Sequence, residues 1–173
     1  MTKLDDEWAA AHSPIIAHKL HALGVVTLEW NKCEAALMWL FHWIVGLPPQ
    51  ECWALFYEMG DIAISERLKS LIKIKKYHPD CAAILENALT FYEKCRLNRN
   101  QLTHFQVVRY PDDILLVRKS KKADTPQHDY FPNELSDVRR VADEIISLER
   151  RLWILAAFLE DRGPMKPAPW PPN

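Results

Sequence analysis

The stretch VRRVADEIISLERRLWILAAFL, residues 138–159, decides the fold of this chain. Its apolar residues recur at alternating intervals of three and four, so they share one side of an α-helix. Asn133 before the stretch and Gly163–Pro164 after it are typical helix ends. A stripe this regular packs on another helix, inside the domain or across a dimer, and we favour packing inside the domain. Its members are Val138, Val141, Ile145, Leu148, Leu152, Leu155 and Leu159.

A similar stripe predicts a long helix near the start of the chain. Ser13–Pro14 opens this helix, and Gly46 with Pro48–Pro49 ends it. The spacing of the apolar side chains between these ends again fits one face of a helix. These side chains are Val26, Trp30, Cys33, Leu37, Leu40 and Ile44.

Three further helices are expected between these two, at about residues 49–59, 61–77 and 79–104. The first of the three offers Trp53, Phe56 and Tyr57 for packing. On the last, apolar residues fall on one side and polar ones on the opposite side. The apolar side comprises Ile84, Ala88, Phe91, Cys95 and Leu102, and the polar side comprises Glu93, Arg96, Asn100 and His104.

The chain changes character after this helix. Two runs rich in β-branched and apolar residues, joined by Pro-Asp-Asp, predict a β-hairpin at about residues 106–118, and residues 119–132 are expected to form a loop. The predicted fold is therefore an all-α bundle of about five helices with a small β-hairpin insertion after the fourth. We expect one domain over residues 1–162.

Residues 163–173 form a tail that contains five prolines and Trp170. Such a composition predicts a disordered or polyproline-II segment. The alternative is a peptide that docks onto a partner.

Composition limits the classes of protein to which the chain can belong. A formal net charge of −1 excludes a general nucleic-acid coating protein but leaves room for a local basic patch. The four widely spaced cysteines are expected to be reduced and mostly buried. The acidic start lacks the pattern of a signal peptide, and the longest apolar run, Ala35–Leu47, is too short to cross a bilayer. We therefore expect a cytoplasmic protein without membrane association.

Polar residues that could carry chemistry gather at the end of the fourth helix. Arg96 and Arg99 lie one turn apart, and two guanidinium groups so placed can grip a phosphate. Asn100 and His104 are also one turn apart, so they can hydrogen-bond, and the histidine could act as a general acid or base. The structural alternative is that Arg96, Arg99 and His104 only satisfy the last carbonyls of the helix.

The pattern Arg99-Asn100-x-x-x-His104 resembles the Arg-x(4–6)-His motif of the HEPN superfamily (Higher Eukaryotes and Prokaryotes Nucleotide-binding), in the common form with Asn directly after Arg. The setting is also similar, because the motif closes a long helix and a hairpin and one more helix follow. The segment Glu29–Glu34 likewise resembles the opening helix of many bacterial relatives. The resemblance covers most of the chain in layout, but only a few residues in motif.

The resemblance implies a metal-independent endoribonuclease in which the ribose 2′-hydroxyl attacks the adjacent phosphate and the motifs of two protomers meet across a two-fold axis. As catalytic residues, Arg99 would neutralise the scissile phosphate and His104 would move protons. Asn100 would orient the histidine or the RNA. Phe105 stands where relatives often carry Gly, which would narrow the approach to the site.

Basic residues surround the motif. Residues 94–122 contain eight lysines and arginines against two aspartates, an excess that would attract RNA or another polyphosphate. The alternative is a solvated face of the hairpin. The residues assigned to substrate binding are Arg96, Asn100, Arg109, Arg118 and Lys119, and Lys121 and Lys122 extend the basic stretch.

Other polar residues are assigned ordinary roles. His18 and His21 have a spacing that could bind a metal, but no acidic residue or cysteine is arranged with them. His42 is expected in the core or at an interface, and Glu34 at the surface or between helices. No metal site and no cofactor are predicted.

The leading hypothesis is thus a HEPN-like RNA endonuclease or RNA-binding protein of a toxin or phage-defence type, a homodimer that could have an antitoxin partner. The alternative is a non-catalytic dimeric helical interaction module.

Overall fold

The computed structural model describes residues 17–103, 106–109, 114–119, 128–130 and 134–162. Within this part the chain forms five helices, which confirms the predicted helical bundle, and three short strands. The helices are α2 (Ala17–Val45), α3 (Pro49–Glu58), α4 (Asp61–Ile74), α5 (Pro79–Thr103) and α6 (Leu135–Arg162). The strands are β1 (Gln106–Arg109), β2 (Ile114–Lys119) and β3 (His128–Tyr130). The predicted helix starts at Ser13–Pro14 and Asn133, and the tail, lie outside the described residues.

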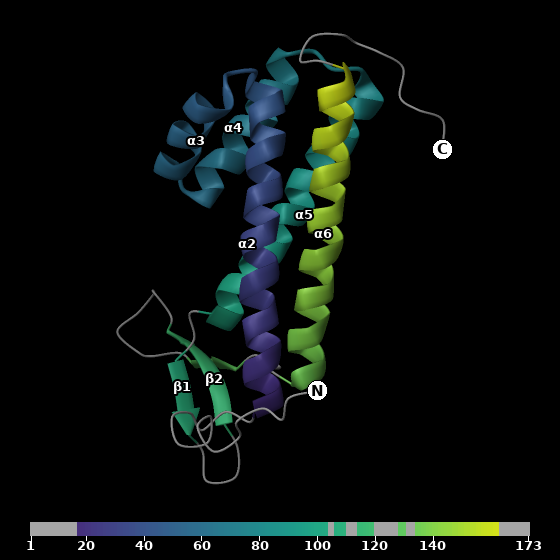
Figure 1. The fold of residues 1–173 in the computed structure, drawn as a ribbon. Coiled ribbons are helices and arrows are strands. Elements are labelled where there is room, and N and C mark those ends of the chain that lie inside the picture. Colours follow the sequence, from purple (N-terminus) through teal and green to yellow (C-terminus); the bar gives the residue numbers. More distant parts are fainter. Residues whose placement is uncertain (1–16, 104–105, 110–113, 120–127, 131–133, 163–173) are drawn as a thin grey trace.

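The core is built around α2 and α6, which run side by side (Figure 1). Every member of the predicted α2 stripe is fully buried, and no member of the α6 stripe is more than 5% exposed. The α6 stripe therefore packs inside the molecule, as favoured from the sequence. Helix α5 packs against this pair, and α3 and α4 cover the end of α2 at Val45 (Figure 1).

The buried side of α5 differs from the prediction. Only Ala88 and Cys95 of the predicted apolar side are fully buried, whereas Ile84, Phe91 and Leu102 are partly buried. The side chains that α5 buries are Cys81, Leu85, Ala88, Leu89, Tyr92 and Cys95. Cys81, Leu85, Ala88, Tyr92 and Cys95 recur at intervals of four and three, so the buried side is a single stripe, which shares only Ala88 and Cys95 with the predicted one. This stripe lies toward the three helices that α5 contacts, α2, α4 and α6.

Helix α4 ends at Ile74, three residues before the predicted end at about Tyr77. Lys76 has a φ of 51°, a left-handed conformation that terminates a helix. The neighbouring Lys75 donates a hydrogen bond from Nζ to the carbonyl oxygen of Val45 at 3.1 Å. This contact ties the end of α4 to the end of α2, and burial lowers the pKa of the Lys75 ammonium.

A small sheet follows α5. Strand β1 pairs antiparallel with β2, with Gln106 opposite Val117, and β2 pairs antiparallel with β3. Both β1 and β2 lie at positions where the hairpin was expected, whereas β3 lies in the segment expected to be a loop. Strand pairing through the backbone needs no apolar alternation, so the pattern of side chains did not indicate β3. The sheet lies where α2 begins and α5 ends (Figure 1).

The four cysteines are free thiols and buried, as predicted. Burial raises the pKa of the Cys95 thiol to about 12 and also raises the pKa values of Cys33, Cys52 and Cys81. None of the helices in the described ranges has the length and apolar character that crossing a bilayer requires.

Candidate functional site

The candidate site lies in the last two turns of α5, beside α2. The structure describes the side chains of Arg96, Arg99 and Asn100, all of which are half-buried. His104, the predicted proton carrier, lies outside the described residues, as do Lys121 and Lys122. The backbone of Arg109 lies in β1, and the backbone of Arg118 and Lys119 lies in β2.

The Arg99 side chain is held between two helices. Its Cζ atom lies over the indole ring of Trp30 in α2, 5.6 Å from the ring centroid, and its NH1 group donates a hydrogen bond of 2.9 Å to Oδ1 of Asn100. The indole is fixed in turn, because its Nε1 donates to Glu34 at 2.7 Å and its ring lies 5.1 Å from that of Tyr92. A buried aromatic ring and a neighbouring amide therefore orient the guanidinium.

Arg96 lies one turn before Arg99. The Nε atoms of both arginines are buried without a hydrogen-bond partner within the described part of the chain. Neither guanidinium takes part in an ion pair among the same residues. A buried N–H without an acceptor costs about 1–3 kcal/mol, so these two groups lack an acceptor that the described residues could supply.

Glu93 was expected on the open polar side of α5, but it contacts α4. Its Oε1 accepts hydrogen bonds from Ser65 Oγ and from Lys69 Nζ, both at 2.8 Å. Burial opposes ionisation of Glu93, but the hydrogen bonds from Lys69 and Ser65, together with the nearby charges of Lys69 and Arg96, outweigh it and lower the pKa of this carboxyl. Glu93 is thus an anchor between helices.

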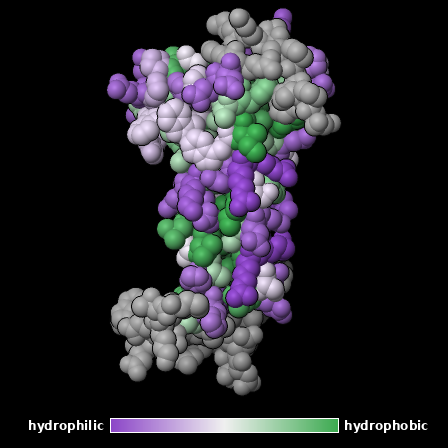
Figure 2. Space-filling model, turned by 45° about the vertical axis from the view of Figure 1, so that its right-hand side comes forward, coloured by the Kyte–Doolittle hydropathy of each residue, from purple (hydrophilic) through white to green (hydrophobic). Residues whose placement is uncertain are grey.

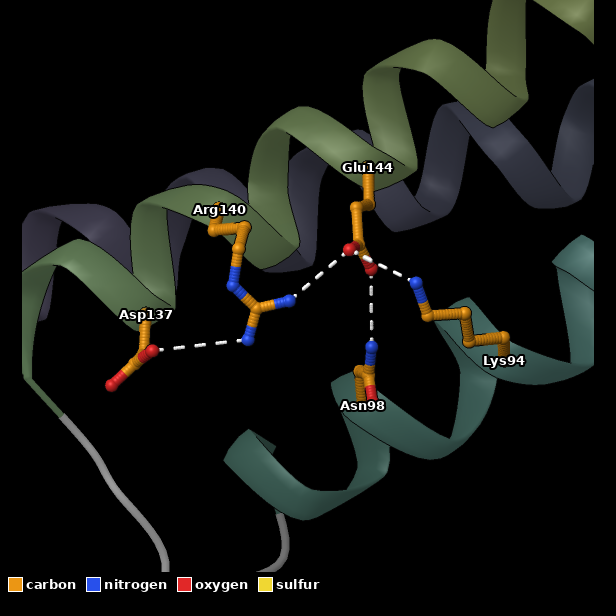
Figure 3. A network of polar contacts seen from close by, with 5 residues as sticks. All are labelled: Lys94, Asn98, Asp137, Arg140 and Glu144. Atoms are coloured by element: carbon orange, nitrogen blue, oxygen red, sulfur yellow. Dashed lines mark hydrogen bonds and ion pairs between the residues drawn. The ribbon is translucent and has the colours of Figure 1, made fainter.

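A second polar network joins α5 to α6 (Figure 3). Glu144 of α6 accepts from Lys94 Nζ at 3.1 Å, from Asn98 Nδ2 at 3.2 Å and from Arg140 at 3.1 Å. Asp137 lies 3.8 Å from the other terminal nitrogen of Arg140. The charge of Lys94, which was counted with the basic stretch, is therefore paired with a carboxylate. The network holds the turn of α5 that carries the site.

The remaining candidates have the ordinary roles expected of them. His42 is buried between Trp39 and Trp43, with ring centroids 5.7 and 4.6 Å away, as a core histidine. Glu34 accepts the indole hydrogen bond within α2, and His18 and His21 are exposed. Among the residues that the structure describes, no three potential metal ligands cluster.

The residues missed from the sequence are those of other helices that contact the last turns of α5: Trp30 at Arg99, Ser65 and Lys69 at Glu93, and Glu144 at Lys94 and Asn98. Trp30 was assigned only to the core stripe, and Ser65, Lys69 and Glu144 were given no role near the site. No spacing in the sequence pairs a residue of α2, α4 or α6 with the end of α5. The arrangement can bind an anionic oxygen through the oriented guanidinium of Arg99. Comparisons of the chain with protein-family models, with curated proteins and with solved structures found no match.

Proposed function

We propose that this protein binds RNA at the end of α5 and cleaves it there without a metal ion, as its resemblance to HEPN proteins implies. Arg99 and Arg96 would bind the phosphate, Asn100 would hold Arg99, and His104 would move protons. The observation that carries the proposal is Arg99, which Trp30 and Asn100 orient and which forms no ion pair among the described residues, with Arg96 one turn before it. The guanidinium groups of both arginines are suited to recognise a phosphate diester. The resemblance favours a toxin or phage-defence role.

The supports of Arg99 make it a suitable phosphate ligand. A guanidinium has five N–H donors, and one hydrogen bond to Asn100 leaves others for a ligand. Stacking on Trp30 restricts the side chain before the ligand arrives, so less conformational entropy is lost on binding. A rigid, always-charged donor is what electrostatic stabilisation of a pentavalent phosphate requires.

The proposed reaction is a transesterification. The 2′ oxygen forms a bond to phosphorus while the bond from phosphorus to the 5′ oxygen breaks, which leaves a 2′,3′-cyclic phosphate and a 5′-hydroxyl. A base removes the proton of the 2′-hydroxyl, and an acid donates a proton to the 5′ oxygen. His104 would serve in one or both of these steps. Arg99 and Arg96 would neutralise the charge that develops on the non-bridging oxygens.

The test is RNA cleavage in EDTA by the full chain. Wild type should cleave, and Arg99→Ala and His104→Ala should each abolish most of the activity without a large change in melting temperature. Arg150→Ala is the matched control, because Arg150 is an exposed arginine on α6. Absence of cleavage by wild type, or full activity in both site variants, would exclude the enzyme.

Binding can be tested separately from cleavage through its salt dependence. Simultaneous neutralisation of Lys119, Lys121 and Lys122 should reduce the slope of log affinity against log salt concentration by about 0.7 for each RNA phosphate that these lysines neutralise. An unchanged slope would remove these lysines from the RNA-binding surface, whatever the outcome of the cleavage assay.

A non-catalytic dimeric interaction module is the second candidate. It is favoured by exposed apolar side chains, which include Leu28, Trp153 and Ile154. Figure 2 shows apolar residues in patches among hydrophilic ones on one face of the bundle. A second copy or an antitoxin partner would cover such patches. If Arg99→Ala lowers stability and wild type cleaves no RNA, the module is the better description.

A further inference from the structure

Helix α3 exposes two large aromatic side chains, Trp53 and Tyr57, which we call the α3 ledge. Trp53 is 46% exposed and Tyr57 is 76% exposed, although the sequence offered both for packing. Their rings are one helical turn apart, 6.4 Å between centroids, in an edge-to-face arrangement. Aromatic residues left open to solvent in this way are typical of surfaces that bind a partner.

The position of the ledge follows from how α3 packs. Cys52 and Phe56 are its buried residues, and Phe56 meets Phe41 of α2 edge to face, 5.9 Å between centroids. Trp53 and Tyr57 each follow one of these buried residues, so they lie on the flank of the helix rather than on its outer side. The flank therefore offers two aromatic rings beside a firmly packed helix.

The chain itself contains a segment of matching chemistry in residues 163–173, GPMKPAPWPPN. Proline-rich segments bind to surfaces lined with Trp and Tyr, because proline rings pack flat on aromatic rings and little conformational entropy is lost. The segment carries one charged side chain, that of Lys166, which is positive. Helix α3 carries Glu51 and Glu58 and no basic residue, so the charges are complementary.

The segment also starts within reach of the ledge. It follows Arg162, the last residue of α6, and this end of α6 lies at the same end of the bundle as α3 (Figure 1). Both α3 and α6 pack on α2, and two interaxial distances of about 10 Å put roughly 20 Å between their axes across α2. An extended proline-rich segment covers about 3.1 Å per residue, so these residues can span roughly 30 Å.

We propose that residues 163–173 bind to the α3 ledge of the same molecule, with proline rings and Trp170 against Trp53 and Tyr57. The tail then shields the two aromatic side chains from solvent and from other proteins. This interaction lies at the end of the bundle away from the proposed RNA site, and it does not depend on whether the protein cleaves RNA.

The test is fluorine NMR of the full chain labelled with 5-fluorotryptophan, with the Trp170 and Trp53 signals assigned by Trp→Phe substitution. The Trp170 signal should be displaced from its position in a synthetic peptide of residues 163–173. In the double variant Trp53→Ala, Tyr57→Ala it should return to the peptide position. Trp153→Ala is the matched control, because Trp153 is 40% exposed on α6, and it should leave the Trp170 signal displaced.

A reciprocal variant leaves the ledge intact. Replacement of Pro167, Pro169 and Pro171 by serine should move the Trp53 signal and leave the melting temperature unchanged. The proposal fails if Trp170 of wild type already has the peptide position, or if Trp153→Ala moves it as far as the ledge variant does. A displacement that disappears on dilution would assign the ledge to the tail of a second copy and overturn binding within one molecule.

Discussion

The guanidinium of Arg99 lies over the indole ring of Trp30, with Cζ 5.6 Å from the ring centroid. This contact joins the polar end of α5 to a fully buried aromatic residue of α2. The interaction of a planar guanidinium with such a ring contributes about 0.5–2 kcal/mol to stability. The compact ammonium of a lysine, on its flexible stem, would not keep the same position. The contact therefore explains why an arginine, rather than any basic residue, suits this position.

The first prediction is that Arg99→Lys lowers RNA cleavage at least about tenfold although the charge is kept, because the oriented fork of donors is lost. The free energy of unfolding should fall by no more than about 2 kcal/mol, the upper value for the lost contact with the ring. Cleavage rates in EDTA and urea denaturation measure the two effects. Arg150→Lys is the control, and equal activity of Arg99→Lys and wild type would show that charge alone suffices.

Regular packing explains what could be predicted from the sequence. The stripes of α2 and α6 were identified correctly because each helix buries one side mainly against the other, so the period of the helix is visible in the residues. Helix α5 offers two overlapping apolar stripes that share Ala88 and Cys95, and its buried Leu85, Leu89 and Tyr92 were missed because the prediction used the neighbouring stripe.

The candidate site was predicted only in part for a different reason. Arg96, Arg99 and Asn100 could be grouped because they lie within two turns of one helix. The contact of Arg99 with Trp30, however, depends on how α2 and α5 pack. Tertiary contacts of this kind leave no spacing in a single sequence.

The second prediction concerns Glu144, which accepts hydrogen bonds from three residues on two helices. Glu144→Gln should lower the free energy of unfolding by about 1 kcal/mol, because exposed ion pairs contribute about 0.2–1 kcal/mol each. The loss should shrink at about 1 M salt, where charges are screened within about 3 Å. Urea denaturation at two salt concentrations measures it, with the exposed Glu160→Gln on the same helix as control. A loss that salt does not change would mean that packing, not charge, is responsible.

The third prediction is a pH dependence that comes from Glu93. Its pKa is lower in the folded state than the value of about 4.3 in an unfolded chain, so ionised Glu93 stabilises the fold above that value. The stabilisation is lost as the pH falls through the lower, folded-state pKa. Glu93→Gln should therefore cost about 0.5–1 kcal/mol near neutral pH, allowing for solvent screening, and less than that at about pH 3.

Urea denaturation of wild type and Glu93→Gln between neutral and acid pH measures this difference. Glu66→Gln is the matched control, because Glu66 is an exposed glutamate on the neighbouring helix α4. A difference between wild type and Glu93→Gln that grows toward acid pH would contradict the assignment.

The fourth prediction tests where the α6 stripe packs. Leu148 is fully buried in the single chain, so Leu148→Ala should lower the free energy of unfolding by about 3–4 kcal/mol. Ile154→Ala, on the same helix but 66% exposed, should change it by less than about 0.5 kcal/mol in a monomer. Urea denaturation at two protein concentrations about tenfold apart distinguishes packing within one chain from packing between two copies. Stability that comes from a dimer interface rises with protein concentration. If the cost of Leu148→Ala depended on concentration, the stripe would belong to an interface between copies, and the core would have to be assigned to two chains rather than one.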